Sequence, residues 1–238
     1  MTSIGTGYDL SASTYSPDGR IFQVEYANKA VENSGTAIGL KVKDGVVLAV
    51  EKLVHSKLLV PGANRRIQTV DRHIGLATAG LPADGRTVAN RARDEAAGYR
   101  DFYRSPPTLK TIADRIGHFV QMYTLYSSVR PFGISTILGA VDKDGPALGY
   151  HGAAVGKGRQ LAKTELEKLK LSELTAREAV IEAARIIYLV HEDAKEKEFE
   201  LEMSWIGPET NGLHVAVPKD LFDEAEAKAK EALVSGLE

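Results

Sequence analysis

The sequence contains no cysteine among its 238 residues. This absence excludes disulfides, thiolate catalysis and cysteine-ligated zinc, and it fits a reducing compartment. No stretch approaches the roughly 18 consecutive apolar residues that a membrane-spanning helix needs. The first five residues also lack the basic and apolar regions of a secretory signal. We therefore expect an intracellular chain with no membrane partner.

An excess of charge of one sign is also missing, because 30 Lys and Arg stand against 32 Asp and Glu. A near-neutral chain argues against general binding to nucleic acid, so we predict no nucleic-acid partner. The histidines show none of the close spacings typical of metal ligands, and Gly156-Lys157 lacks the spacing of a phosphate-binding loop. We therefore expect no metal site, no cofactor and no catalytic residue from these motifs.

The hydrophobic pattern predicts strands and helices in separate blocks, which favours an α+β sandwich over alternating βαβ units. A tail with a first helix is expected over 1–34, followed by a single domain over 35–238. Asp44-Gly45 predicts a hairpin turn, and Thr175 with Glu178 forms a capping box. The expected strands are 36–50 (a hairpin), 66–70, 74–79, 134–141, 201–206 and 213–217, and the expected helices are 84–103, 108–127, 158–170, 175–194 and 222–234.

The most specific stretch is the opening of the chain, from Tyr8-Asp9 through the turn Ser16-Pro17-Asp18-Gly19 to the helical residues 22–27. Pro17 presets the backbone of the turn, and Asp18 and Gly19 tolerate its conformations. The literal string resembles the N-terminal signature of the alpha-type subunits of the proteasome. The resemblance covers nearly the whole chain. It is carried by residues 34–52, 70–86, 123–133 and 210–214, while residues 5–20 and 200–207 are most similar to the family member at the seventh position of the alpha ring.

This resemblance implies a four-layer α-β-β-α sandwich of two antiparallel five-stranded sheets, the fold of N-terminal nucleophile hydrolases. It also implies a non-catalytic subunit of the heteroheptameric alpha ring of the 20S core particle. The expected roles are ring assembly, axial pore gating and activator docking in ubiquitin-dependent and ubiquitin-independent protein degradation. The expected partners are neighbouring alpha subunits, beta-ring subunits, activators and the regulatory particle, in the cytoplasm and nucleus.

Two sets of residues match functional positions of the family. Tyr8, Asp9, Pro17 and Tyr26 match the cluster that holds the gate open, although an aromatic cluster that merely ties down the tail is the alternative.

Arg66, Gly80, Leu81 and Gly35 match the pocket that receives the C-terminal tails of activators. Arg66 replaces the usual lysine, so it keeps the charge but changes the reach and geometry. An ordinary turn before a helix remains the alternative for Gly80 and Leu81.

An active N-terminal threonine hydrolase, released by cleavage before Thr36, is the alternative function. Residues 34–47 resemble the start of proteasome beta subunits. In that match the nucleophile position falls on Gly35, while Glu51 and Arg66 take the places of the catalytic aspartate and lysine. Glycine has no hydroxyl, and Thr36 has no free amine while residues 1–35 remain attached. We therefore predict that the catalytic chemistry is missing.

The chain is shorter than family members between Gly145 and Gly152, where they carry a further strand and turn. Either a hairpin has been trimmed or the sequence omits residues. The glycine-rich segment that follows is intact, which favours omission.

Overall fold

The computed structural model describes residues 7–142, 145–147, 149–194 and 198–235. The helices are α1 (Phe22–Glu32), α2 (Pro82–Tyr103), α3 (Leu109–Met122), α4 (Arg159–Lys168), α5 (Ala176–Ala194) and α6 (Lys219–Ser235). The strands are β1 (Ala37–Lys41), β2 (Val46–Leu53), β3 (Ile67–Asp71), β4 (Ile74–Gly80), β5 (Ile134–Asp142), β6 (Gly145–Ala147), β7 (Gly152–Val155), β8 (Phe199–Ile206) and β9 (Val215–Ala216).

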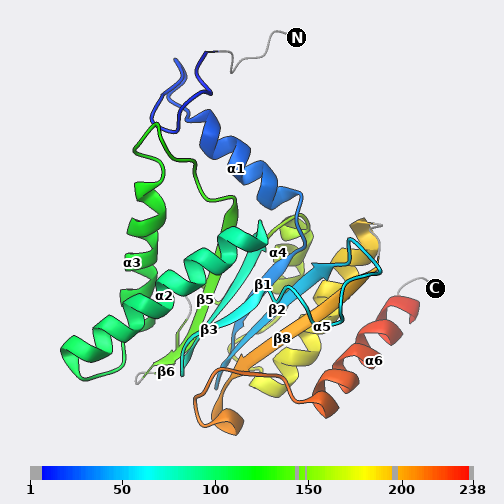
Figure 1. Ribbon diagram of the computed structural model, residues 1–238. Helices are drawn as coiled ribbons and strands as arrows, with labels where there is room; N and C mark the ends of the chain where they lie inside the picture. The colour runs from blue at the N-terminus through cyan, green and yellow to red at the C-terminus, as the bar shows by residue number, and fades with distance from the viewer. Residues whose placement is uncertain (1–6, 143–144, 148, 195–197, 236–238) are drawn as a thin grey trace.

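Two antiparallel sheets lie face to face between two layers of helices (Figure 1). One sheet has the strand order β7-β1-β2-β8-β9, and α4, α5 and α6 cover its outer face. The other has the order β3-β4-β5-β6, and its outer face packs against α2 and α3. The predicted α-β-β-α sandwich is therefore confirmed. The division of the chain at residue 34 stays a prediction.

The local signals in the sequence account for several of these elements. Val42 donates its amide to the Gly45 carbonyl at 2.9 Å, which closes the predicted hairpin between β1 and β2. At the start of α5 the Thr175 amide donates to the Glu178 carboxylate, and the Glu178 amide donates back to the Thr175 hydroxyl. The capping box is thus confirmed, because each side chain accepts a hydrogen bond from a backbone amide that the helix start leaves free.

The two sheets approach each other most closely at two glycines of the second sheet, where no side chain would fit. A methyl group at Gly139 would lie 2.6 Å from Val46, and one at Gly75 would lie 2.4 Å from the ring of His214. The His214 imidazole bonds Thr69 of β3 and Ser204 of β8, each at 2.8 Å, so it links the two sheets.

Several details differ from the expectations, among them strands β6 and β7, which are not among the expected strands, and β9, which spans Val215–Ala216 rather than 213–217. The second sheet has four strands in the described part of the chain rather than five, because β6 has three residues and β7 begins shortly after it. Helix α3 ends at Met122 rather than near residue 127. The ring of Tyr123 packs on Phe132 with centroids 4.5 Å apart, so the chain turns toward β5 at that point.

No helix within the described ranges is both long and apolar enough to cross a membrane.

Candidate functional site

The N-terminal segment is held by the predicted turn. The Ser16 amide donates to the Arg20 carbonyl at 2.8 Å, and the Gly19 amide donates to the Ser16 carbonyl at 2.9 Å. Gly19 has a φ of 75°, a conformation that glycine adopts without a steric penalty. The turn leads into α1, and the residues before it lie beyond the N-terminal end of that helix, away from both sheets (Figure 1).

Asp9 is tied to α1 by two contacts. The Tyr26 hydroxyl donates to the Asp9 carboxylate at 3.1 Å, and the Gln23 amide donates to the Asp9 carbonyl. The bond to Asp9 raises the pKa of Tyr26, because the anionic carboxylate favours the protonated phenol. Tyr8 and Pro17 are exposed as well, and no hydrogen bond of the Tyr8 side chain appears within the described residues. The structure therefore brings together Asp9 and Tyr26 of the four predicted residues.

All four residues of the second predicted set line one pocket of about 390 Å³. The pocket lies between the C-terminal end of α1, the end of β2 and the N-terminus of α2. Its walls include the predicted residues Gly35, Arg66, Gly80 and Leu81.

The Arg66 side chain is oriented by the pocket itself. Its Nη1 donates to the Gly80 carbonyl at 2.6 Å, and its backbone amide donates to the Glu202 carboxylate at 2.8 Å. Partial burial lowers the pKa of Arg66, and the charge of Glu202 opposes that shift. An arginine keeps its proton at neutral pH in such surroundings, so the pocket holds a fixed positive charge.

The pocket also contains a second cation that sequence reasoning missed. Lys52 lies directly opposite Glu200 in the pairing of β2 with β8, and its Nζ is 2.5 Å from the Glu200 carboxylate and 2.6 Å from the Ala63 carbonyl. The ion pair with Lys52 lowers the pKa of Glu200. Alternation along β2 could have placed Lys52 on one face, but its partner lies far away in sequence and is fixed only by strand pairing.

The two glycines of the pocket are required by close backbone approach. Gly80 has a φ of 115°, and a methyl group there would lie 2.1 Å from the Gly133 carbonyl oxygen. At Gly35 the same group would lie 2.0 Å from the Glu51 carbonyl oxygen. Any side chain at either position would push the backbone apart, so the shape of the pocket depends on both residues being glycine.

Thr36, the residue considered as a nucleophile, is an internal and fully buried residue immediately before β1. Its backbone amide donates to the Glu51 carboxylate at 2.9 Å, and its hydroxyl accepts a bond from the Gly158 amide at 3.0 Å. The Glu51 carboxylate also lies 2.7 Å from Nδ1 of His191. These bonds hold the start of β1 in place, and the hydroxyl serves as an acceptor within the core.

Comparison with known proteins decides the family. The model of the proteasome subunit family matches residues 31–206, and the model of the N-terminal signature of A-type proteasome subunits matches residues 8–30. The chain belongs to the proteasome subunit family. The match of the N-terminal signature covers Tyr8, Asp9, Pro17 and Tyr26, and it identifies the chain as an alpha-type subunit.

Several relatives are similar over nearly the full length. The alpha type-3 proteasome subunit of Acanthamoeba castellanii is 64% identical, with 97% of this chain and 96% of the relative covered. The protein of the same name from Oryza sativa is 58% identical, with 98% of both chains covered. The probable alpha type-7 proteasome subunit of Saccharomyces cerevisiae is 61% identical, with 94% of this chain and 83% of the relative covered. These names confirm the predicted similarity to one alpha-ring position.

The alignment with the Oryza relative spans 243 positions, more than the 238 residues of this chain, so the relative carries residues without a counterpart here.

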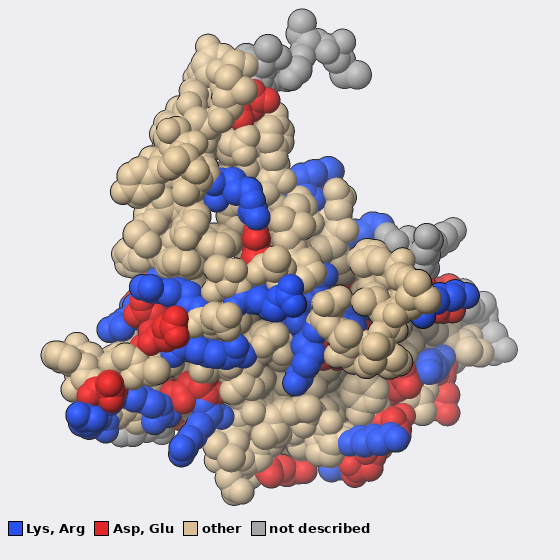
Figure 2. Space-filling model, in the orientation of Figure 1, with Lys and Arg blue, Asp and Glu red and all other residues tan. Residues whose placement is uncertain are grey.

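The charges on the face in view are mixed. Figure 2 shows Lys and Arg interspersed with Asp and Glu over the area that α2 and β3 occupy in Figure 1. Within the described ranges, no group of three or more histidine or acidic side chains is placed to hold a metal ion. The lysine and the arginine that line the pocket are Lys52 and Arg66.

Proposed function

We propose that this chain is a non-catalytic subunit of the alpha ring of the 20S proteasome, a threonine-type endopeptidase complex. It assembles with neighbouring alpha subunits and with beta-ring subunits. The pocket of Gly35, Arg66, Gly80 and Leu81 is the observation that carries the proposal, because it joins all the residues that match the family's docking pocket. The names of the relatives support assembly into a proteasome.

In this proposal the pocket binds the terminal carboxylate of an activator or of the regulatory particle. The Nη1 of Arg66 is held by the Gly80 carbonyl, which leaves the other guanidinium N–H groups oriented for a carboxylate. Lys52 adds a positive charge that Glu200 offsets in part. Leu81, the N-cap residue of α2, is 42% exposed. It offers an apolar contact to the activator side chains that precede the carboxylate.

The test compares assembled particles that carry Arg66→Ala with particles that carry Arg65→Ala. Arg65 is the neighbouring arginine, but its exposed guanidinium is bound to Glu202 and is not part of the pocket wall. Loss of a charge-assisted hydrogen bond predicts that Arg66→Ala raises the activator concentration for half-maximal peptide hydrolysis by about tenfold. If both variants need the same activator concentration for half-maximal hydrolysis, the pocket does not bind the activator's carboxylate.

The contact of Asp9 with Tyr26 supports a second role, in holding open the axial pore that the N-terminal tails close. The variant Tyr26→Phe keeps the ring and removes the hydroxyl that binds Asp9. We expect activator-stimulated peptide hydrolysis to fall by about threefold, the effect of one hydrogen bond near the surface. Tyr15→Phe, at a more exposed tyrosine of the same segment, is the control and should leave hydrolysis unchanged.

The absence of catalysis is supported by the surroundings of Gly35 and Thr36. Glycine supplies no nucleophile, and the amine of Thr36 is a peptide nitrogen bonded to Glu51. The proposed setting is ubiquitin-dependent and ubiquitin-independent protein degradation in the cytoplasm and nucleus. A sequence without cysteine fits these reducing compartments, and imaging of a fluorescently tagged chain tests the location.

A further inference from the structure

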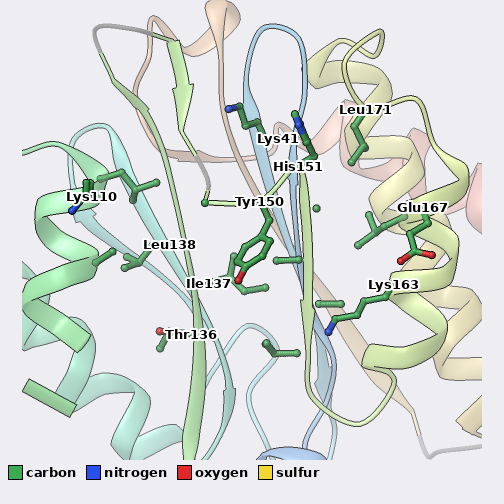
Figure 3. A pocket seen from close by; sticks show the side chains of 18 of the residues that line it. Lys41, Lys110, Thr136, Ile137, Leu138, Tyr150, His151, Lys163, Glu167 and Leu171 are labelled. Atoms are coloured by element: carbon green, nitrogen blue, oxygen red, sulfur yellow. The ribbon is translucent and has the colours of Figure 1, made fainter. Parts of the chain in front are cut away.

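Two cavities of the described structure differ in what they indicate about binding. The larger, of about 1650 Å³, lies between α3 with β5 and β7 with α4 (Figure 3). It borders the connection between Gly145 and Gly152, where family members carry a further strand and turn, so this space adjoins a shortened part of the chain. The charged side chains that line the docking pocket, Lys52, Arg66 and Glu200, have defined contacts, and these contacts indicate which ligands the pocket accepts.

Glu200 holds Lys52 at the wall of the docking pocket. The Glu200 carboxylate lies 2.5 Å from the Lys52 Nζ and accepts a bond from the Gly62 amide at 3.3 Å. Lys52 also donates to the Ala63 carbonyl at 2.6 Å, and its side chain is 11% exposed. The hydrogen bond from Lys52 lowers the pKa of Glu200, so this carboxylate keeps its negative charge at neutral pH. The positive charge of Lys52 is therefore offset within the pocket before any ligand binds.

Arg66 is the other cation of the pocket, and its guanidinium is bound to a neutral acceptor. Its Nη1 donates to the Gly80 carbonyl, and no acidic side chain among the described residues is bound to the guanidinium. The Glu202 carboxylate reaches Arg66 at the backbone amide, and it pairs with the Arg65 guanidinium outside the pocket wall. That outer pair adds no net charge. The pocket wall itself has two cations and one anion, so a single positive charge is in excess, on Arg66.

One positive charge in excess matches a ligand with a single negative charge. A terminal carboxylate alone satisfies Arg66. Consecutive Cα atoms are about 3.8 Å apart, so the next-to-last side chain of a bound polypeptide lies within reach of the same pocket wall. A carboxylate on that side chain would face the carboxylate of Glu200 or compete with it for Lys52. Like charges repel, most strongly where water is partly excluded.

We propose that Glu200 makes the docking pocket selective for a polypeptide C-terminus whose only negative charge is the terminal carboxylate. A terminus with an acidic residue next to last is disfavoured. In this inference, which rests on the proposed docking function, Arg66 binds the terminal carboxylate. Glu200 determines the specificity, because it occupies Lys52 and repels a second carboxylate.

The probes are three short peptides that differ only at their C-terminal end. Each has an acetylated N-terminus, a benzophenone group for photo-crosslinking and otherwise uncharged side chains. The first has Asn next to last and a free terminal carboxylate, the second has Asp in place of that Asn, and the third is the first with a terminal amide. His55 also lines the pocket, so labelling is done at pH 8.5, above the range in which histidines normally titrate.

The peptides are crosslinked to assembled particles, and mass spectrometry of the released subunits measures the labelling of this chain alone. With the original chain, the amide peptide should need at least about tenfold more peptide for half-maximal labelling than the Asn peptide. The Asp peptide should need about threefold more, the effect of one charge contact in a partly exposed pocket. A higher salt concentration should reduce this preference for Asn over Asp.

A matched pair of variants tests the role of Glu200. Glu200→Gln keeps an oxygen that can accept the Gly62 amide but removes the charge that offsets Lys52. The Asp peptide should then bind at least as tightly as the Asn peptide. Glu198→Gln removes the same charge from a nearby glutamate that is not part of the pocket wall, and it should leave the preference for Asn unchanged.

A double variant identifies the cation that receives the second carboxylate. Adding Lys52→Met to Glu200→Gln should abolish the improved binding of the Asp peptide, and native gels check that each variant chain enters the particle. A preference for Asn over Asp that persists in Glu200→Gln, while the carboxylate is still favoured over the amide, would overturn this inference alone. Equal labelling by the carboxylate and amide peptides would overturn the proposed docking function as well.

Discussion

The two sheets are closed tightly at their centre and open at the edge formed by β5 and β7. At the centre, Gly75 and Gly139 leave no room even for a methyl group, and His214 bonds both sheets. At the edge, a cleft of about 1650 Å³ separates the same two layers. The difference shows that close packing of the sheets depends on glycines and continuous strand pairing, and that it ends where β6 stops pairing with β5.

The largest expected effect is on the acid stability of the closed centre. Burial, with a smaller effect from the charge of Arg65, lowers the pKa of His214 to about 4 from 6.5. The unfolded chain therefore takes up this proton first, so the stabilisation is complete above pH 6.5 and is lost as the pH falls toward 4. The loss amounts to about 3 kcal/mol.

Urea unfolding at a series of pH values measures this loss. His214→Gln, which does not titrate, should show an acid dependence smaller by that amount. An identical dependence in the variant and the original chain would show that His214 is not the group responsible.

A smaller effect is expected from Gly75→Ala, which places a methyl group against the His214 ring and 3.0 Å from Leu48. The ring is fixed by its two hydrogen bonds, so the strain cannot be relieved by a simple rotation. We expect a loss of about 2 kcal/mol in the free energy of unfolding, as is typical of overpacked cores. A variant as stable as the original chain would mean that the centre is looser than these distances indicate.

The smallest expected effect has the opposite sign and lies at the open edge. Gly117→Ala adds the same methyl group within α3, where it meets no atom within 4 Å. Alanine favours the helix, so the free energy of unfolding should rise by up to about 1 kcal/mol. Thermal unfolding compares the two alanine variants directly, and destabilisation by Gly117→Ala would show that the cleft is not open in solution.

Much of the fold follows from local signals in the sequence. Asp44-Gly45 predicts the turn between β1 and β2, and the capping box of Thr175 and Glu178 predicts the start of α5. The end of α3 is not predictable in this way, because the aromatic contact of Tyr123 with Phe132 depends on how the chain folds back toward β5.

The residues of the candidate site also fall into two groups, those that can be named from the sequence and those that cannot. Residues that match family motifs, such as Arg66 and Gly80, can be named from the sequence and are found in one pocket. Lys52 and its partner Glu200 cannot, because their contact depends on the register of β2 with β8. The bond between Asp9 and Tyr26 is predictable as a type of contact, but which tyrosine makes it emerges only from the structure.

The central claim, that this chain is not a processed hydrolase but a member of the alpha ring, is tested most directly by native mass spectrometry of the complex that contains it. Release of the chain in the same experiment gives its intact mass. The account predicts a chain that retains Tyr8 to Tyr26, within a particle that also contains other alpha and beta subunits. A chain that begins at Thr36, with a free amine at that threonine, would contradict it.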